Sequence, residues 1–256
     1  MPAGAVERLA GGDLSEVLLL RRDGAPAIVA KGGPAVGTEA AMLRALARVG
    51  TAVPAIEAEY DDVLMLSHVP NDGLFSARAW SAIGVALRAL HDKHGRHYGW
   101  PVDYRLGTVT LDNRQRDDWP GFWGEQRLVA TASVLDRPVR ERVERLAARV
   151  GDLLPGSPPP SFLHGDLWSG NILVKDGALA ALIDPACYGG DAEVDLAMLT
   201  LFDAPPDVFW DSYGQLEPGW EERRPVYQLF PALVHLRLFG ASYAGMVDRL
   251  LARLAA

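Results

Sequence analysis

The chain has only one cysteine, Cys187, among 256 residues, which excludes an internal disulfide framework. A lone cysteine in an apolar stretch is usually a small buried hydrophobe. The chain also lacks a net positive charge. Its formal net charge is -8, so no basic field would attract nucleic acid or anionic lipid. No apolar run approaches the length of a bilayer span, and the first residues lack the pattern of a signal peptide. We therefore expect a cytoplasmic protein with neither a nucleic-acid nor a membrane partner.

Hydrophobic residues make up 49% of the sequence and charged residues 23%, which is ordinary for a globular enzyme. Such a chain can bury a full core, as one domain or as two lobes. Short apolar runs and turn residues predict a β-meander over 5–31 and a hairpin over 56–66. Helical spacing predicts helices over 38–50, 77–91, from 118, 139–154, 223–243 and 246–254. The polar segment 91–118 predicts a loop.

One stretch carries a recognisable chemistry. His164-Gly-Asp166-Leu-Trp-Ser-Gly-Asn171 has the spacing of a kinase catalytic loop. In such a loop the Asp faces the hydroxyl that attacks the γ-phosphate, and the Asn faces a Mg²⁺ ion on the other side of the phosphates. The apolar run 179–183 ends in Asp184, which fits a buried strand that delivers a carboxylate to the metal. Together these features predict phosphoryl transfer with ATP and Mg²⁺.

Two further residues fit the phosphate side of such a site. Lys31 ends the predicted strand Ile28-Val-Ala-Lys31, which resembles the V-A-I-K sequence whose lysine grips the α- and β-phosphates. Glu39 lies in the first turn of the helix over 38–50, with Thr38 as its candidate N-cap. It either favours the helix dipole or pairs with Lys31. Gly12 precedes the first clear strand, where a phosphate loop or an ordinary tight turn would lie.

The segment 67–73 breaks the strand pattern. It predicts a hinge between an N-terminal nucleotide-binding lobe, residues 1–68, and a C-terminal catalytic and substrate lobe, residues 69–256. Backbone groups at Ser67 and Val69 would bind the edge of the adenine ring. The predicted fold class is α+β, a bilobal protein-kinase-like fold with a small β-rich first lobe and a larger, mainly helical second lobe.

The catalytic loop, together with Ile183-Asp-Pro-Ala186 and Asp195-Leu-Ala-Met198, resembles the fructosamine kinase (ketosamine-3-kinase) family, a branch of the aminoglycoside-phosphotransferase-like fold. Trp168 is the discriminating residue, because many relatives share H-G-D-x-x-x-x-N without L-W-S-G. Further stretches agree along nearly the whole chain. They are Gly12-x-x-Ser15-Glu16, Asn113 with Asp117 to Pro120, Arg127-Leu128, Tyr188-Gly189 and Tyr227 to Gly240.

The resemblance implies roles for individual residues. Asp166 would be the base, Asn171 and Asp184 would hold Mg²⁺, and Lys31 would hold phosphates, braced by Glu39. Gly12 and Ser15 would lie in the phosphate loop, and the substrate-pocket candidates are His164, Trp168 and Tyr188. The implied substrate is a ketosamine, small or protein-bound, whose phosphorylation at the sugar O3 releases the amine. We expect a monomer.

The sequence departs from the family at two places. Asp13 stands where several relatives have a cysteine, and Leu201-Phe-Asp203-Ala replaces Leu-Phe-Gly-Gly. One alternative is a kinase of another small alcohol, such as an aminoglycoside, choline or a sugar. Another is a nucleotide-binding module without turnover, which the intact catalytic set disfavours. A protein kinase is disfavoured because ten residues separate Asp184 from Asp195 and no Ala-Pro-Glu follows.

Overall fold

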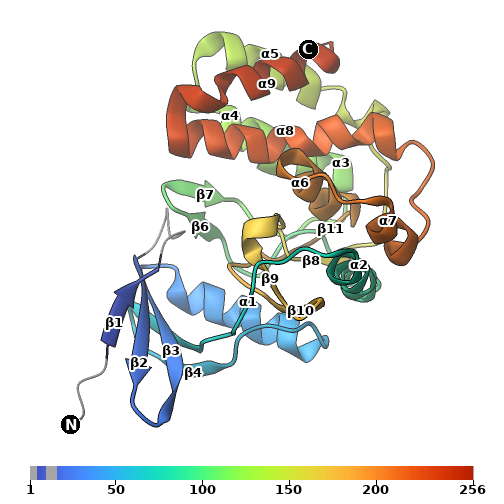
Figure 1. The fold of residues 1–256 in the computed structure, drawn as a ribbon. Coiled ribbons are helices and arrows are strands. Elements are labelled where there is room, and N and C mark those ends of the chain that lie inside the picture. The colour runs from blue at the N-terminus through green and yellow to red at the C-terminus, as the bar shows by residue number, and fades with distance from the viewer. Residues whose placement is uncertain (1–4, 10–15, 256) are drawn as a thin grey trace. The chain divides into compact units, whose positions relative to one another are not determined.

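The structure, a computed structural model, describes residues 5–9 and 16–255. The predicted phosphate-loop residues Gly12 and Ser15 lie outside the described residues. The chain forms two compact units (Figure 1). The N-terminal unit comprises the residues up to Leu90 with Trp168–Ala186 and Pro205–Gly214. The C-terminal unit comprises His91–Leu167, Cys187–Ala204 and the residues from Gln215 onward. The functional division at residues 68 and 69 stays a prediction.

The N-terminal unit is built on an antiparallel sheet of strand order β1-β2-β3-β5-β4. Its strands are β1 (Ala5–Arg8), β2 (Glu16–Arg22), β3 (Ala25–Gly32), β4 (Ile56–Glu59) and β5 (Val63–Ser67). The predicted meander and hairpin are thereby confirmed. Gly24, in the turn between β2 and β3, has a φ of +72°. A left-handed φ of this kind suits glycine because it has no Cβ.

Helix α1 (Val36–Arg48) covers this sheet through a small apolar core. Ala40 and Leu43 of the helix pack with Leu64 and Leu66, which alternate along β5 and are buried. The predicted N-cap at Thr38 is wrong, because the helix begins two residues earlier, after Ala35, and has no side-chain cap. The helical spacing of apolar residues predicted this helix correctly, but it did not predict the residue at which the helix begins.

Other elements complete the N-terminal unit. They are α2 (Ala77–His91), η3 (Ser169–Asn171), the hairpin of β9 (Ile172–Lys175) with β10 (Ala178–Leu182), and α7 (Asp207–Tyr213). Helix α2 approaches α7 closely at Gly84, where a Cβ would lie 2.6 Å from the carbonyl oxygen of Phe209. The rings of Phe209 and Trp80 meet edge to face, with centroids 5.9 Å apart. Glycine at position 84 therefore permits the packing that joins these two helices.

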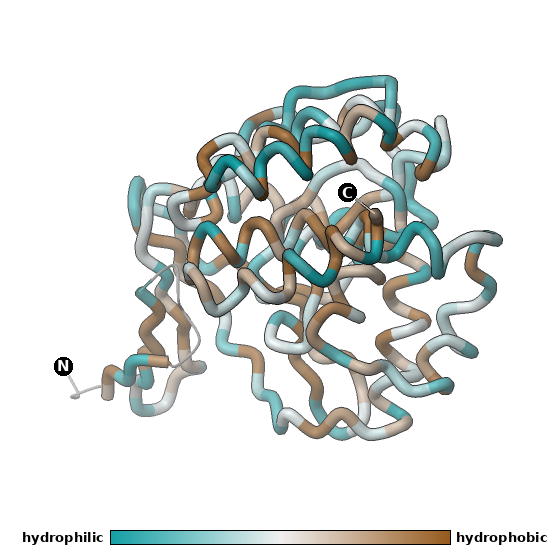
Figure 2. Tube along the Cα trace, turned by 90° about the horizontal axis from the view of Figure 1, so that it is seen from above, coloured by the Kyte–Doolittle hydropathy of each residue, from teal (hydrophilic) through white to brown (hydrophobic). Residues whose placement is uncertain are grey.

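The C-terminal unit combines helices with two short ladders, β6–β7 and β8–β11. The ladders comprise β6 (Tyr104–Leu106), β7 (Val109–Leu111), β8 (Ser161–Leu163) and β11 (Tyr188–Gly190). The helices are α3 (Trp119–Gly121), η1 (Phe122–Val129), α4 (Ala130–Ala132), α5 (Arg137–Ala147), η2 (Val150–Asp152), α6 (Glu193–Phe202), α8 (Trp220–Phe239), η4 (Gly240–Tyr243) and α9 (Ala244–Arg253). Brown and teal segments alternate along helices in Figure 2, as amphipathic helices require.

Large aromatic side chains form the centre of the C-terminal unit. Trp119 and Trp123 are fully buried, and the indole of Trp119 donates a hydrogen bond of 3.0 Å to the hydroxyl of Tyr227. The rings of Tyr227 and Trp123 also meet edge to face, with centroids 5.0 Å apart. Within the described parts of the chain, no helix is both long and apolar enough to cross a membrane.

Three elements of the C-terminal unit differ from the sequence-based expectations. The helix that was expected over 139–154 ends at Ala147, and the short 3-10 helix η2 follows it. The predicted loop over 91–118 contains the hairpin β6–β7, whose strands have three residues each and are too short for a periodic signal. The helix that was expected from residue 118 begins with α3, where the side chain of Asp118 accepts from the amide of Gly121. It then widens into the π-helix η1, a form that occurs often at functional sites.

Candidate functional site

The β9–β10 hairpin brings the two predicted metal ligands together within the N-terminal unit. Ile172 at the start of β9 pairs with Leu182 at the end of β10. The ladder is extended by the amide of Ile183, which donates 3.0 Å to the carbonyl of Asn171. Asn171 directly precedes β9 and Asp184 directly follows Ile183, so the antiparallel register places both residues at one end of the hairpin.

Lys31 connects this end of the hairpin with the sheet and helix α1. Its Nζ lies 2.7 Å from Glu39 Oε1 and 2.7 Å from Asp184 Oδ1. Lys31 is 6% exposed and Glu39 5%. Burial by itself lowers the pKa of Lys31, but the two carboxylates outweigh it and raise that pKa above its usual value. Lys31 is therefore a fixed cation, held by a buried carboxylate on one side and a half-exposed one on the other.

The backbone of Asp184 has an unusual conformation. Its φ is +54°, in the left-handed region that non-glycine residues seldom adopt and that costs about 1–3 kcal/mol. The side chain remains 40% exposed although it contacts Lys31. This strained conformation aims a carboxylate at solvent beside a lysine, as a metal or phosphate site requires.

The donor set at this end suits Mg²⁺. Asp184 offers carboxylate oxygens and Asn171 an amide oxygen, which are hard ligands. The described residues contain no group of three or more His, Cys, Asp or Glu that could hold a metal ion by themselves. One carboxylate and one amide oxygen fit Mg²⁺, which usually binds through one or two carboxylates together with substrate phosphates.

The first part of the catalytic loop lies in the C-terminal unit, where Asp195 anchors it. The β8–β11 ladder pairs Leu163 with Tyr188, which brings the residues after β8 towards the start of α6. There Asp195 Oδ2 accepts 2.7 Å from the amide of His164, and Oδ1 accepts 2.9 Å from the amide of Gly165. The ring of His91 lies 3.1 Å from Oδ2. Three groups therefore converge on one carboxylate directly before Asp166.

Asp195 is completely buried. Burial alone would raise the pKa of its carboxyl, but the hydrogen bonds from His91 and from the loop amides outweigh burial and lower that pKa. The sequence offered only a weak signal for this role, because an acid in the first turn of a helix normally indicates a dipole interaction. Its hydrogen-bond partners in the loop could not be identified from the sequence, because the β8–β11 ladder brings them towards Asp195.

The three substrate-pocket candidates differ in their exposure to solvent. His164 and Tyr188 are buried, whereas Trp168 is 39% exposed. Tyr188 lies under the guanidinium of Arg127, 4.3 Å from the ring centroid, and burial raises the pKa of its phenol to about 12. The predicted substrate roles of all three residues remain predictions.

The remaining predicted nucleotide contacts lie at the end of β5. Ser67 Oγ accepts 2.9 Å from the amide of Ala55, and the amide of His68 donates 3.1 Å to the carbonyl of Ala27. Val69 follows and is half-buried. This segment is thus tied to β3 and to the residue before β4. The predicted adenine contacts of Ser67 and Val69 remain predictions.

The indole of Trp168 lies directly on Gly170. A Cβ at position 170 would lie 2.3 Å from the nearest ring atom of Trp168, so Gly170→Ala must displace the ring. Because the family resemblance places Trp168 in the substrate pocket, we expect kcat/KM for the acceptor to fall roughly 10- to 100-fold, with little change in the KM for ATP. Steady-state kinetics against each substrate measures this split.

Trp168→Ala supplies the matched control for that prediction. Once the ring is absent, Gly170→Ala should add no further loss, because there is nothing left to displace. A double variant that is as impaired as the product of the two single effects would contradict the proposed positioning of Trp168 by Gly170.

A pocket opens beside Asp166 within the C-terminal unit. Its empty space, counted together with the adjoining solvent, is about 400 Å³. Its walls come from the β6–β7 hairpin, the catalytic loop, α6 and α8. The lining residues are Leu106, Leu111, Gly165, Asp166, Val194, Met198, Phe230, Pro231, Val234 and His235. The sequence did not reveal this pocket, because its walls come from four separate segments.

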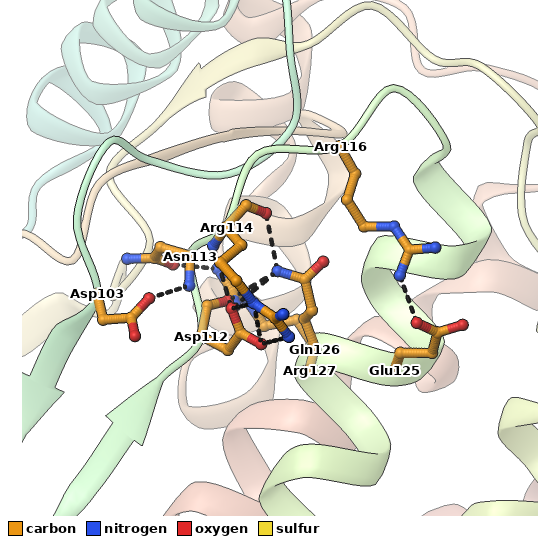
Figure 3. A network of polar contacts seen from close by, with 8 residues as sticks. All are labelled: Asp103, Asp112, Asn113, Arg114, Arg116, Glu125, Gln126 and Arg127. Carbon is orange, nitrogen blue, oxygen red and sulfur yellow. Dashed lines mark hydrogen bonds and ion pairs between the residues drawn. The ribbon is translucent and has the colours of Figure 1, made fainter.

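A polar network fixes the wall made by β6 and β7 (Figure 3). Arg127 of η1 donates 2.6 Å to the carbonyl of Asp112 and 2.7 Å to Asn113 Oδ1. Gln126 donates 2.8 Å to the carbonyl of Arg114, and the amide of Asn113 donates 2.9 Å to Asp103 Oδ1. The π-helix therefore clamps the segment that follows β7, and the pocket wall is held in place before any ligand binds.

Cys187 is buried, as expected from the sequence. Burial raises the pKa of its thiol well above the usual value, and the charge of Asp195 adds to this effect. Because the thiolate is the reactive form, we expect no alkylation of the native protein by iodoacetamide at pH 7.5 and rapid alkylation in denaturant. We also expect no disulfide-linked dimer after mild peroxide treatment. Intact-mass measurement and a non-reducing gel test both outcomes, and fast labelling of the native thiol would contradict them.

Comparisons with known proteins agree with this architecture. A "probable ketoamine kinase" of Lactiplantibacillus plantarum is 38% identical over 181 residues, which is 67% of this chain and 65% of the relative. The match thus spans just under two thirds of that relative's length. The crystal structure of a "putative fructosamine-3-kinase" from Thermobifida fusca has a TM-score of 0.88 and 30% identity, covering 99% of this chain and 93% of that one.

A more distant structure shares the fold alone. The macrolide 2'-phosphotransferase of Brachybacterium faecium has a TM-score of 0.63 and 20% identity, with 97% of this chain and 92% of that one covered. The predicted α+β, protein-kinase-like fold is thereby confirmed. The family model described as fructosamine kinase matches residues 6–256. With nearly the whole chain matched, this protein belongs to the fructosamine kinase family.

Proposed function

We propose that this chain is an ATP-dependent kinase that transfers the γ-phosphoryl group to the O3 hydroxyl of a ketosamine. The observation that carries the proposal is the buried Lys31, whose Nζ lies 2.7 Å from both Glu39 and Asp184. This is the lysine, glutamate and metal-binding aspartate set on which kinases depend. Family membership supports the ketosamine as the acceptor.

In this proposal each half of the site has its own task. Lys31 holds the α- and β-phosphates, and Glu39 keeps its ammonium in place. Asp184 and Asn171 hold Mg²⁺, which when bound neutralises charge that develops on the phosphates. Asp166 accepts the proton of the attacking sugar hydroxyl. Asp195 fixes the two residues before Asp166 and thereby orients that base.

The product of this reaction is a ketosamine 3-phosphate. Phosphorylation at O3 destabilises the adduct, so that the amine is released, as the family resemblance implies. Phosphoryl transfer itself requires only positioning and charge stabilisation, which the buried lysine and the anchored loop supply. The proposed role is therefore the removal of sugar adducts from small or protein-bound amines.

A substrate panel tests the proposal. ATP consumption and product mass are measured with fructosyl-, ribulosyl- and erythrulosyl-lysine, and with an aminoglycoside and choline as alternative acceptors. We expect transfer to at least one ketosamine and none to the aminoglycoside or choline. Transfer to the controls alone would replace the proposed acceptor with another small alcohol, and binding of ATP without any transfer would favour a nucleotide-binding module.

Removal of the metal provides a further prediction. Because Asp184 and Asn171 offer hard oxygen ligands, activity should vanish in EDTA and return with excess Mg²⁺, whereas Zn²⁺ should not restore it. Initial rates before and after back-titration measure this. Full activity in the presence of chelator would contradict the metal assignment.

A further inference from the structure

The pocket beside Asp166 has walls of a distinct chemistry. Seven of its ten lining residues have hydrocarbon or thioether side chains, contributed by β6–β7, α6 and α8. Asp166 is the only carboxylate among them, and His235 supplies the only other polar side chain. A polycationic ligand needs several carboxylates to replace its water. The pocket therefore does not suit an aminoglycoside, although it lies next to the proposed base.

His235 does not add a charge to this pocket. Its Nδ1 lies 2.8 Å from the carbonyl of Pro231, and because a carbonyl can only accept, Nδ1 must donate. Burial lowers the pKa of the ring, which favours the neutral form at pH 7. Its ring also lies among aromatic side chains, with centroids 4.8 Å from Phe202 and 4.9 Å from Tyr243. The imidazole thus contributes a flat, uncharged surface.

A ketosamine has two parts that favour different surroundings, a polar sugar and a substituent on the amine nitrogen. The sugar carries several hydroxyl groups that require polar partners, and one of them must reach Asp166. The substituent on the amine nitrogen can be a plain hydrocarbon. Mostly apolar walls leave most sugar hydroxyls without partners, and buried polar groups without partners are costly. The transfer of a hydrocarbon substituent from water to apolar walls, in contrast, is favourable.

We propose that this pocket binds the substituent on the amine nitrogen of the acceptor, and that it selects ketosamines of uncharged, hydrocarbon amines. The inference rests on the proposed function and adds the chemical class of the amine. Val194 and Met198 of α6 and Val234 of α8 would contact the substituent. The network around Arg127 holds the wall made by β6 and β7, so little ordering is needed when the substituent binds.

A homologous acceptor series tests the proposal. The sugar is the one of the three that is phosphorylated most efficiently in the substrate panel, and the amine is ethylamine, propylamine or butylamine. Each buried methylene should raise kcat/KM about fourfold, which gives about a fifteenfold rise from ethyl to butyl. The acceptors made from β-alanine and, singly, from 1,3-diaminopropane have a similar length but a charged end. They should react at least roughly tenfold less efficiently than the butyl compound, because a charge must then enter an apolar pocket.

Two valine variants on α8 localise the effect. Val234→Thr keeps the side-chain shape but replaces one methyl group by a hydroxyl. The hydroxyl can donate a hydrogen bond to a helix carbonyl, so the fold should be kept. This variant should reduce the butyl-to-ethyl ratio severalfold and leave the KM for ATP within twofold of wild type. Val226→Thr is the matched control, because Val226 is buried in the same helix but does not line the pocket. Its butyl-to-ethyl ratio should equal that of wild type.

The possible outcomes separate this inference from the proposed function. Phosphorylation of every member of the amine series at the same efficiency, or a preference for the charged ends, overturns the inference and leaves the kinase assignment intact. An unchanged ratio in Val234→Thr also overturns it. If none of the fructosyl, ribulosyl or erythrulosyl compounds is phosphorylated, the proposed function and the inference both fall.

Discussion

Replacement of Asp166 by asparagine is expected to lower turnover by roughly 10²- to 10⁴-fold, the usual contribution of a positioned general base. The amide keeps the shape of the side chain but cannot accept the proton of the sugar hydroxyl. ATP binding should stay near its wild-type affinity, because Lys31 and Asp184, which belong to the N-terminal unit, are unchanged. Steady-state kinetics and a direct ATP-binding measurement test both parts.

The matched control for that variant is Asp176→Asn. Asp176 lies in the turn between β9 and β10, and its side chain is 83% exposed. Its φ of +51° is tolerated well by asparagine, so turnover should not change. Near-normal turnover of Asp166→Asn would remove Asp166 from the role of base. A loss of ATP affinity equal to the loss of turnover would point to a folding defect instead.

Local sequence patterns placed Lys31, Glu39 and Asp184 correctly in the fold, whereas their roles towards phosphate and metal remain predictions. Lys31 ends a strand and Glu39 lies in the first turn of the next helix, and the contact predicted between them is present at 2.7 Å. Asp184 follows an apolar strand as expected. Its direct contact with Lys31 could not be predicted, because it depends on a left-handed φ at Asp184 and on the approach of residues 153 positions apart.

The acceptor side was much less predictable. The pocket is bordered by β6 and β7, whose strands are too short to show a period. Arg127 matched the family, but its buried position over Tyr188 depends on the π-helix η1. Such features arise from packing among distant segments, and a single sequence carries no local signal for them.

Asp195 also combines two roles that look alike in sequence. An acid at the start of α6 satisfies the helix dipole whether or not it has other partners. In this fold the same carboxylate is buried and accepts from His164 and Gly165. Because its pKa is lowered in the folded state, its stabilising contribution is complete above the ordinary pKa of about 3.9. That contribution is lost as the pH falls through the lower, folded-state pKa.

Removal of the Asp195 carboxylate should therefore lower both the stability of the fold and the turnover of the enzyme. Asp195→Ala leaves two loop amides and the His91 ring without their acceptor, and the free energy of unfolding should fall by about 2–5 kcal/mol. Turnover should fall even at temperatures where the variant is fully folded, because the residues before Asp166 lose their anchor. Asp195→Asn should lose less stability, since its amide oxygen still accepts, and should weaken the acid dependence of unfolding.

Asp248→Ala is the control, because its side chain is 63% exposed in a surface ion pair with Arg142 and should change stability by no more than about 0.5 kcal/mol. Chemical denaturation between pH 3 and 8 and kinetics at low temperature distinguish the two effects. A folded Asp195→Ala with wild-type turnover would show that Asp195 is only a structural residue. Loss of turnover in the folded variant, with an unchanged KM for ATP, would identify its carboxylate as the group that positions Asp166.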